Sequence, residues 1–326
     1  MRHGDFRERL DHEGVAGVAT SGNVEFDKEI LTLYHRPKEE NFIGQTRGDR
    51  TITAEDVTQD ITRLNDFEQS PKFSKEKGTH AVLAEYAILH GINKLNWFGP
   101  NATAELTSRY DDYMNGIDLL ITIKNPGQEP LVFGIDATAS VEESVLEHKY
   151  QRELDKAVVG RGTRLKYSNW DKPVQIMIVA LQPLIFERLA EVMTGNTKYA
   201  DLELAAKTVT LELLIREATN NIGRILDKQK LPHPEFATTQ DVIDYLKSEG
   251  FTQDRKTLSK SILAEFYTYN AIIKTFEQPY LDAREILTQK EKGEQLYLLT
   301  HNKMINRILT GLTTTIATIN PVIEAA

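Results

Sequence analysis

Two aspartates, Asp118 and Asp136, each lie inside an otherwise apolar stretch of the chain. Both stretches are typical of β-strands, and residues 125–130 between them are rich in turn formers, so the sequence predicts a hairpin. A carboxylate within an apolar strand costs several kcal/mol unless something pairs with it. If Asp118 points to the same face of the sheet as Asp136, the pair indicates a shared cation. The alternative is that both are turn or edge carboxylates paired with Arg109 or Lys149.

A third carboxylate, Glu85, lies in a helix that the apolar spacing predicts over residues 74–90, with Gly91 as its cap. The helical neighbours of Glu85 are apolar, so its side chain is expected to point inward. The alternative is a glutamate that extends to solvent or to a salt bridge. Oxygen ligands, in a chain without cysteine and without paired histidines, favour Mg²⁺ or Mn²⁺ over zinc.

The elements that must position these carboxylates follow from the periodicity of the chain. Apolar residues at helical spacing predict a helix over residues 54–68, which begins at a capping box formed by Thr53 and Asp56. Residues 174–181 form a strong predicted strand. Because a helix over about 140–160 separates this strand from the hairpin, we expect a crossover connection and parallel pairing.

Other regions are less periodic. Residues 1–50 are polar, and we expect a loose arm with a short element at Lys28–Tyr34. Lys94–Phe98 has the pattern of a short strand. Asp111 and Asp112 are interpreted as turn residues rather than ligands.

From Phe186 onward the pattern is helical. Helices are expected over residues 200–228, 238–247, 255–277, 285–300 and 303–319. The sequence therefore predicts an N-terminal arm and helix (1–73), an α/β core (74–185) and a helical domain (186–326). Residues 238–277 allow a weaker alternative, a helix-turn-helix that reads DNA, although short αα-hairpins are common.

Composition restricts the classes of function. The 326 residues include no cysteine, which excludes disulfides, thiolate zinc sites and cysteine nucleophiles. The net charge of −9 argues against a broad basic surface. One locally basic stretch, residues 161–172, is either a phosphate-binding stripe or a solvated helix end and loop. The polar first residues do not form a signal peptide and no run is long enough to span a bilayer, so we expect a cytoplasmic protein.

The order of elements over residues 75–182 resembles the core of the PD-(D/E)XK nuclease superfamily, and Gly134–Thr138 looks like a poorly described bacterial branch of it. The resemblance implies a restriction-endonuclease-like mixed sheet flanked by helices. It implies that Asp118, Asp136 and the Ala137 carbonyl bind metal, and that Glu85 assists. The implied activity is hydrolysis of nucleic-acid phosphodiester bonds, with DNA favoured over RNA. The resemblance also implies a homodimer, for which the long C-terminal helices are a candidate interface.

The chain departs from this pattern at Thr138, where the family usually has lysine. Threonine does not supply the positive charge that positions the attacking water. Lys124 lies six residues from Asp118 in sequence, about 20 Å along a strand, and is rejected. The alternative function is a catalytically inactive scaffold or interaction protein that keeps the nuclease fold.

Lys149 is the other candidate for the missing lysine, and its reach depends on where its helix begins. A start near Val145 puts Lys149 about 6 Å along the helix axis, whereas a start near Val141 puts it about 12 Å along. In the second case Glu142 or Glu143 would act in the site instead.

Overall fold

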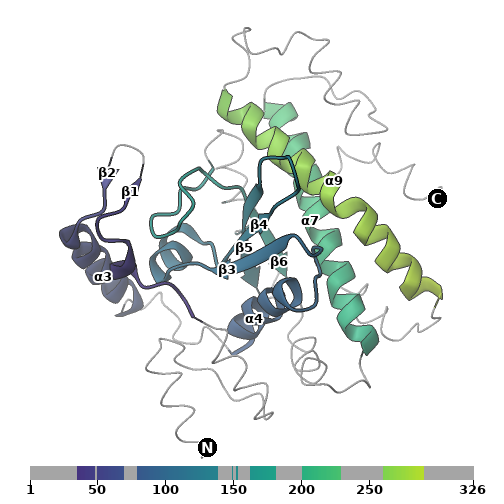
Figure 1. The fold of residues 1–326 in the computed structure, drawn as a ribbon, viewed down its shortest axis with the longest axis horizontal. Helices are drawn as coiled ribbons and strands as arrows, with labels where there is room; N and C mark the ends of the chain where they lie inside the picture. The colour runs from purple at the N-terminus through teal and green to yellow at the C-terminus, as the bar shows by residue number, and fades with distance from the viewer. Residues whose placement is uncertain are drawn as a thin grey trace, which may run out of the picture. The chain divides into compact units, whose positions relative to one another are not determined.

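The computed structural model describes residues 35–47, 50–69, 79–138, 149, 152, 162–180, 200–228 and 260–289 (Figure 1). The chain is mixed α/β and forms two compact units. The first contains Met1–Ser140 and Arg164–Lys207, and the second contains Val141–Thr163 and Thr208–Ala326. No helix within the described ranges combines the length and the apolar character that a bilayer span needs.

A four-stranded mixed sheet forms the centre of the first unit, in the order β3-β4-β5-β6. Its strands are β3 (Ala102–Leu106), β4 (Leu119–Ile123), β5 (Leu131–Thr138) and β6 (Ile176–Ala180). β4 pairs antiparallel with both β3 and β5, and β6 pairs parallel with β5. The predicted hairpin and the predicted parallel strand are both confirmed.

The short strand predicted at Lys94–Phe98 is wrong, because the strand before the hairpin is β3. In β3, Ala102, Ala104 and Leu106 are buried while the residues between them are exposed, which is the alternation of a sheet with one covered face. Residues 94–98 instead form turns after the helix. They contain Asn96 in the left-handed region (φ 53°), a conformation that ends a helix rather than extending a strand.

The N-terminal elements are better ordered than the loose arm that the sequence predicts for residues 1–50. Residues 35–51 contain a 3₁₀ turn, η1 (Glu39–Phe42), and a two-stranded ribbon, β1 (Thr46–Arg47) and β2 (Arg50–Thr51). Phe42 and Ile52 join a small core with Val57 and Tyr167. The element predicted at residues 28–34 lies outside the described residues.

Helix α3 (Ala54–Gln69) confirms the predicted helix and its start. The Asp56 amide donates to the Thr53 hydroxyl at 3.1 Å, and the Thr53 amide donates to Asp56 Oδ2 at 3.0 Å. This reciprocal pair is the predicted capping box. Hydrogen bonds that Thr53 donates to this carboxylate, from its amide first and then from its hydroxyl, hold the pKa of Asp56 below its usual value.

Helix α4 (Thr79–Asn93) packs against β3 and β5 (Figure 1). It runs past Gly91, so Gly91 is not the predicted cap. The fully buried indole of Trp97 folds back over Gly91, and a Cβ there would lie 2.4 Å from the Trp97 ring. The glycine is required by this close approach of the ring to the helix backbone.

Replacing Gly91 with alanine is therefore expected to destabilise the protein, although alanine is about 1 kcal/mol better in a helix. Overpacking against a fixed ring costs about 1–3 kcal/mol, which exceeds the gain in propensity. Urea unfolding of Gly91→Ala, alone and combined with Trp97→Leu, measures this. The alanine should cost less in the Trp97→Leu background, and an equal cost in both would contradict the account.

The second unit contains two long helices. α7 (Ala200–Lys228), whose first residues belong to the first unit, matches the predicted helix. α9 (Lys260–Gln289) continues through Pro279, so the predicted break between residues 277 and 285 is wrong. Phe276, Tyr280 and Ala283 are buried along α9, which favours continuing the helix across the proline. The helices predicted at 238–247 and 303–319, and most of that at 140–160, lie outside the described residues.

Candidate metal centre

Three buried carboxylates come together in the first unit. Glu85, Asp112 and Asp118 each offer an oxygen, and these oxygens all lie within 4.8 Å of one another. The residues are 1%, 7% and 5% exposed. Such a group is unfavourable when ionised, because the charges repel and water is largely excluded.

Each carboxylate comes from a different element. Glu85 lies in the middle of α4 and is buried, which confirms that it points inward, and it pairs with Arg36, which is the salt bridge of the alternative. Asp112 lies in η2, a π-helical turn over Asp111–Asn115, and Gly116 ends the turn in the left-handed region (φ 70°). π-Turns are rare and occur frequently at functional sites.

Asp118 is presented by an irregularity at the start of β4. Leu119 is the register partner of Ile135, yet the amide of Asp118 also donates to the Ile135 carbonyl, at 2.9 Å. Two residues of one strand thus face one residue of the other, which is the pattern of a β-bulge. The Oδ2 atom of Asp118 accepts the amide of Ala137 at 2.7 Å, so this side chain is held against the backbone of β5.

Arg36 is a cation that pairs with two of these carboxylates. Its Nη2 atom is paired with Glu85 and lies 3.1 Å from Asp112 Oδ2, while Nη1 donates to the Thr107 carbonyl at 3.1 Å. The Arg36 side chain is only 14% exposed, so its charge is weakly screened. Through these contacts Arg36 links the segment that precedes η1 to the acidic group.

Arg36 brings one positive charge to this group of three carboxylates, and a divalent cation bound there would bring two more. The donors are oxygens alone, which is the chemistry that Mg²⁺ and Mn²⁺ prefer. The residues present thus fit such an ion in number, charge and donor type.

Two other predicted site residues, Asp136 and Lys149, lie outside the group of three carboxylates. Asp136 is 4% exposed on β5, one residue before the Ala137 amide that binds Asp118, but it is not a member of the group of three. By alternation Asp136 shares a face of β5 with Gly134 and Thr138. Lys149 is helical and half-buried, and it belongs to the second unit.

Arg109, the partner that the alternative assigns to the strand carboxylates, pairs with Glu68. Two lysines of the basic stretch pair with acids that are distant in sequence, Lys166 with Asp60 and Lys172 with Glu129. Leu165 and Tyr167 of the same stretch are buried, so its middle packs into the core and is not a solvated loop.

The sequence analysis did not identify Asp112 or Arg36 as site residues. Asp111 does stabilise a turn, as expected for both aspartates, because it accepts the amides of Lys166 and Tyr167 at 2.8 Å each and bonds to Ser108 and Asn115. Burial raises the pKa of Asp111, and these donors act against that shift. Asp112 instead lies beside Arg36 and near the carboxylates of Glu85 and Asp118, although nothing in the local sequence distinguishes the two aspartates.

Comparison of the chain with known protein families, with curated proteins and with solved structures finds no match.

Proposed function

We propose that this chain is a metal-dependent nuclease that hydrolyses phosphodiester bonds of nucleic acid, DNA in preference to RNA. The observation that carries the proposal is the buried group of Glu85, Asp112 and Asp118 with Arg36 among them. Its support is the order of elements, in which a glutamate-bearing helix precedes an aspartate at the start of one strand and Asp136 on the next.

In this proposal Glu85, Asp112 and Asp118 hold Mg²⁺ or Mn²⁺. When bound, the ion would lower the pKa of water and stabilise negative charge on phosphate oxygens. The Ala137 amide holds Oδ2 of Asp118, and in this proposal a carboxylate oxygen of Asp118 binds the ion. Burial of all three carboxylates limits competing water.

Arg36 takes the role that lysine usually has in the family that the chain resembles. Thr138 carries no charge, whereas Arg36 pairs with Glu85 and Asp112 of the acidic group. A guanidinium is always charged and presents several donors in one plane, which suits a phosphate. We assign to Arg36 the binding of the phosphate that is attacked.

Asp136 remains a predicted metal ligand and Lys149 a predicted catalytic residue. Asp136 is adjacent in sequence to the amide that holds Asp118. A second function, an inactive scaffold, is favoured by one observation. Arg36 already pairs with two of the three carboxylates, and a guanidinium that stays there would stabilise the fold without metal.

The test is cleavage of single- and double-stranded DNA and RNA with millimolar Mn²⁺ or with EDTA. Wild type should cleave DNA only with the metal, and Asp136→Ala should lose at least about 100-fold in rate, the scale of one electrostatic group in a site, with an unchanged melting temperature. Retained activity would remove Asp136 from the mechanism. Metal binding without cleavage of any substrate would support the scaffold.

A further inference from the structure

A second feature of the first unit adjoins the acidic group. A pocket of about 470 Å³ lies between the C-terminal part of α4, the edge strand β3 and the segment that contains Arg36. This volume is within the range of small-molecule sites, which is about 300–1,000 Å³. Arg36 lines the pocket and also pairs with Glu85 and Asp112, so one side chain connects the two sites.

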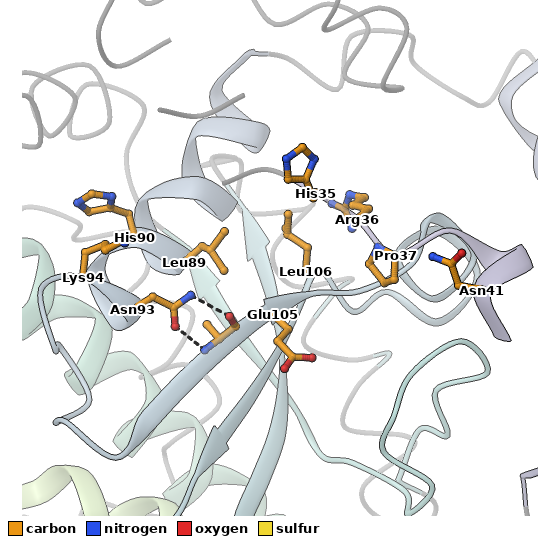
Figure 2. Close-up of a pocket in the computed structure, with 11 residues that line it drawn as sticks. His35, Arg36, Pro37, Asn41, Leu89, His90, Asn93, Lys94, Glu105 and Leu106 are labelled. Atoms are coloured by element: carbon orange, nitrogen blue, oxygen red, sulfur yellow. Dashed lines mark hydrogen bonds between the residues drawn. The ribbon is translucent and has the colours of Figure 1, made fainter. Parts of the chain in front are cut away.

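The lining of the pocket has basic groups on opposite sides. Figure 2 shows His90 and Lys94 of α4 on one side and His35 and Arg36 on the other, with Leu89 and Leu106 between them. The one acidic side chain in the lining is Glu105. Within the described residues, no ion pair involves Lys94, whose side chain is exposed and available to an anion.

A peptide strand is a poor occupant of this pocket, because the backbone amide and carbonyl of Ala104, on the outer edge of β3, already have hydrogen-bond partners. The side chain of Asn93 accepts the Ala104 amide at 2.8 Å and donates to the Ala104 carbonyl at 2.9 Å (Figure 2). An added strand would need these same backbone groups. The basic sides instead suit an anion, and the two leucines suit a flat or apolar moiety.

We propose that this pocket binds one nucleotide of a nucleic-acid strand, with its two flanking phosphates at the two basic sides and its sugar or base against Leu89 and Leu106. The inference rests on the proposed nuclease function, because Arg36 would then contact both the attacked phosphate and the neighbouring nucleotide. It adds a substrate-binding site that lies outside the acidic group.

The probe is thymidine 3′,5′-bisphosphate, which carries both phosphates, with binding measured by calorimetry on the full chain in EDTA. Wild type should bind the bisphosphate, whereas thymidine and inorganic phosphate should bind at least tenfold more weakly. Lys94→Gln should weaken bisphosphate binding about tenfold, as expected for one lost charge-assisted hydrogen bond. Lys124→Gln, which removes an exposed lysine outside the pocket, is the matched control and should bind as wild type does.

Equal binding by Lys94→Gln and wild type would overturn the inference, as would binding of thymidine as tight as that of the bisphosphate, or no binding at all. Asp118→Asn separates this proposal from the nuclease proposal. Asp118 does not line the pocket, so the variant should keep bisphosphate affinity even though it loses the metal. Bisphosphate binding by a wild-type protein that shows no metal response would leave the pocket supported and the nuclease proposal contradicted.

Discussion

In the Asp118→Asn variant, millimolar Mn²⁺ should no longer raise the melting temperature of the protein. In wild type, an ion present at 100 times its dissociation constant stabilises the folded state by about 2.7 kcal/mol. For a unit of this size that corresponds to a rise of about 5–10 °C. An amide in place of Asp118 removes one of the three negative charges and presents a donor or a weaker ligand to the ion.

The matched control is Asp66→Asn, which makes the same chemical change at an exposed position of α3. Differential scanning calorimetry with Mn²⁺ and with EDTA should show the full rise in Asp66→Asn and none in Asp118→Asn. An equal rise in both variants would mean that the ion binds elsewhere.

The adjacent aspartates Asp111 and Asp112 should respond oppositely to the same change, one losing stability and the other losing the response to Mn²⁺. Asp111→Asn should lower the free energy of unfolding by about 2–5 kcal/mol, since an amide nitrogen would face buried donors and leave them unsatisfied, at about 1–3 kcal/mol each. It should keep the response to Mn²⁺. Asp112→Asn should lose that response and change stability without metal by only about 1 kcal/mol, because the lost contact with Arg36 is offset by relief of carboxylate repulsion.

Urea unfolding of both variants, with Mn²⁺ and with EDTA, gives the four free energies that this comparison needs. If Asp111→Asn lost the metal response and Asp112→Asn kept it, the assignment of their roles would be inverted. If both lost it, the geometry of η2 as a whole, rather than Asp112 alone, would hold the site.

The parts of the fold that rest on local pattern could be predicted from the sequence. The apolar, β-rich runs that contain Asp118 and Asp136, with turn residues between them, predicted β4 and β5, and the capping box at Thr53 predicted the start of α3. The strand β3 was misplaced, because its small residues Ala102 and Ala104 give a weaker apolar signal than Trp97 and Phe98. Those two aromatics are buried for another reason, since Trp97 covers Gly91.

The candidate site was only partly predictable, because some of its residues are brought there by contacts between distant parts of the chain. Glu85 and Asp118 stood out as carboxylates in apolar surroundings, and such surroundings are visible in sequence. Arg36 and Glu85 lie 49 residues apart in the chain, and no periodicity connects them. Asp112 differs from Asp111 only through tertiary contacts, and the bulge at Asp118 depends on the register with β5, so none of these features has a local signature.

The most direct measurement of the central claim is the anomalous diffraction of a crystal of the protein grown or soaked with Mn²⁺. The account predicts a strong anomalous peak within coordination distance of carboxylate oxygens of Glu85, Asp112 and Asp118, with Arg36 still close to the group. A peak only at other residues, or no peak while Arg36 remains bound between Glu85 and Asp112, would contradict a metal centre here.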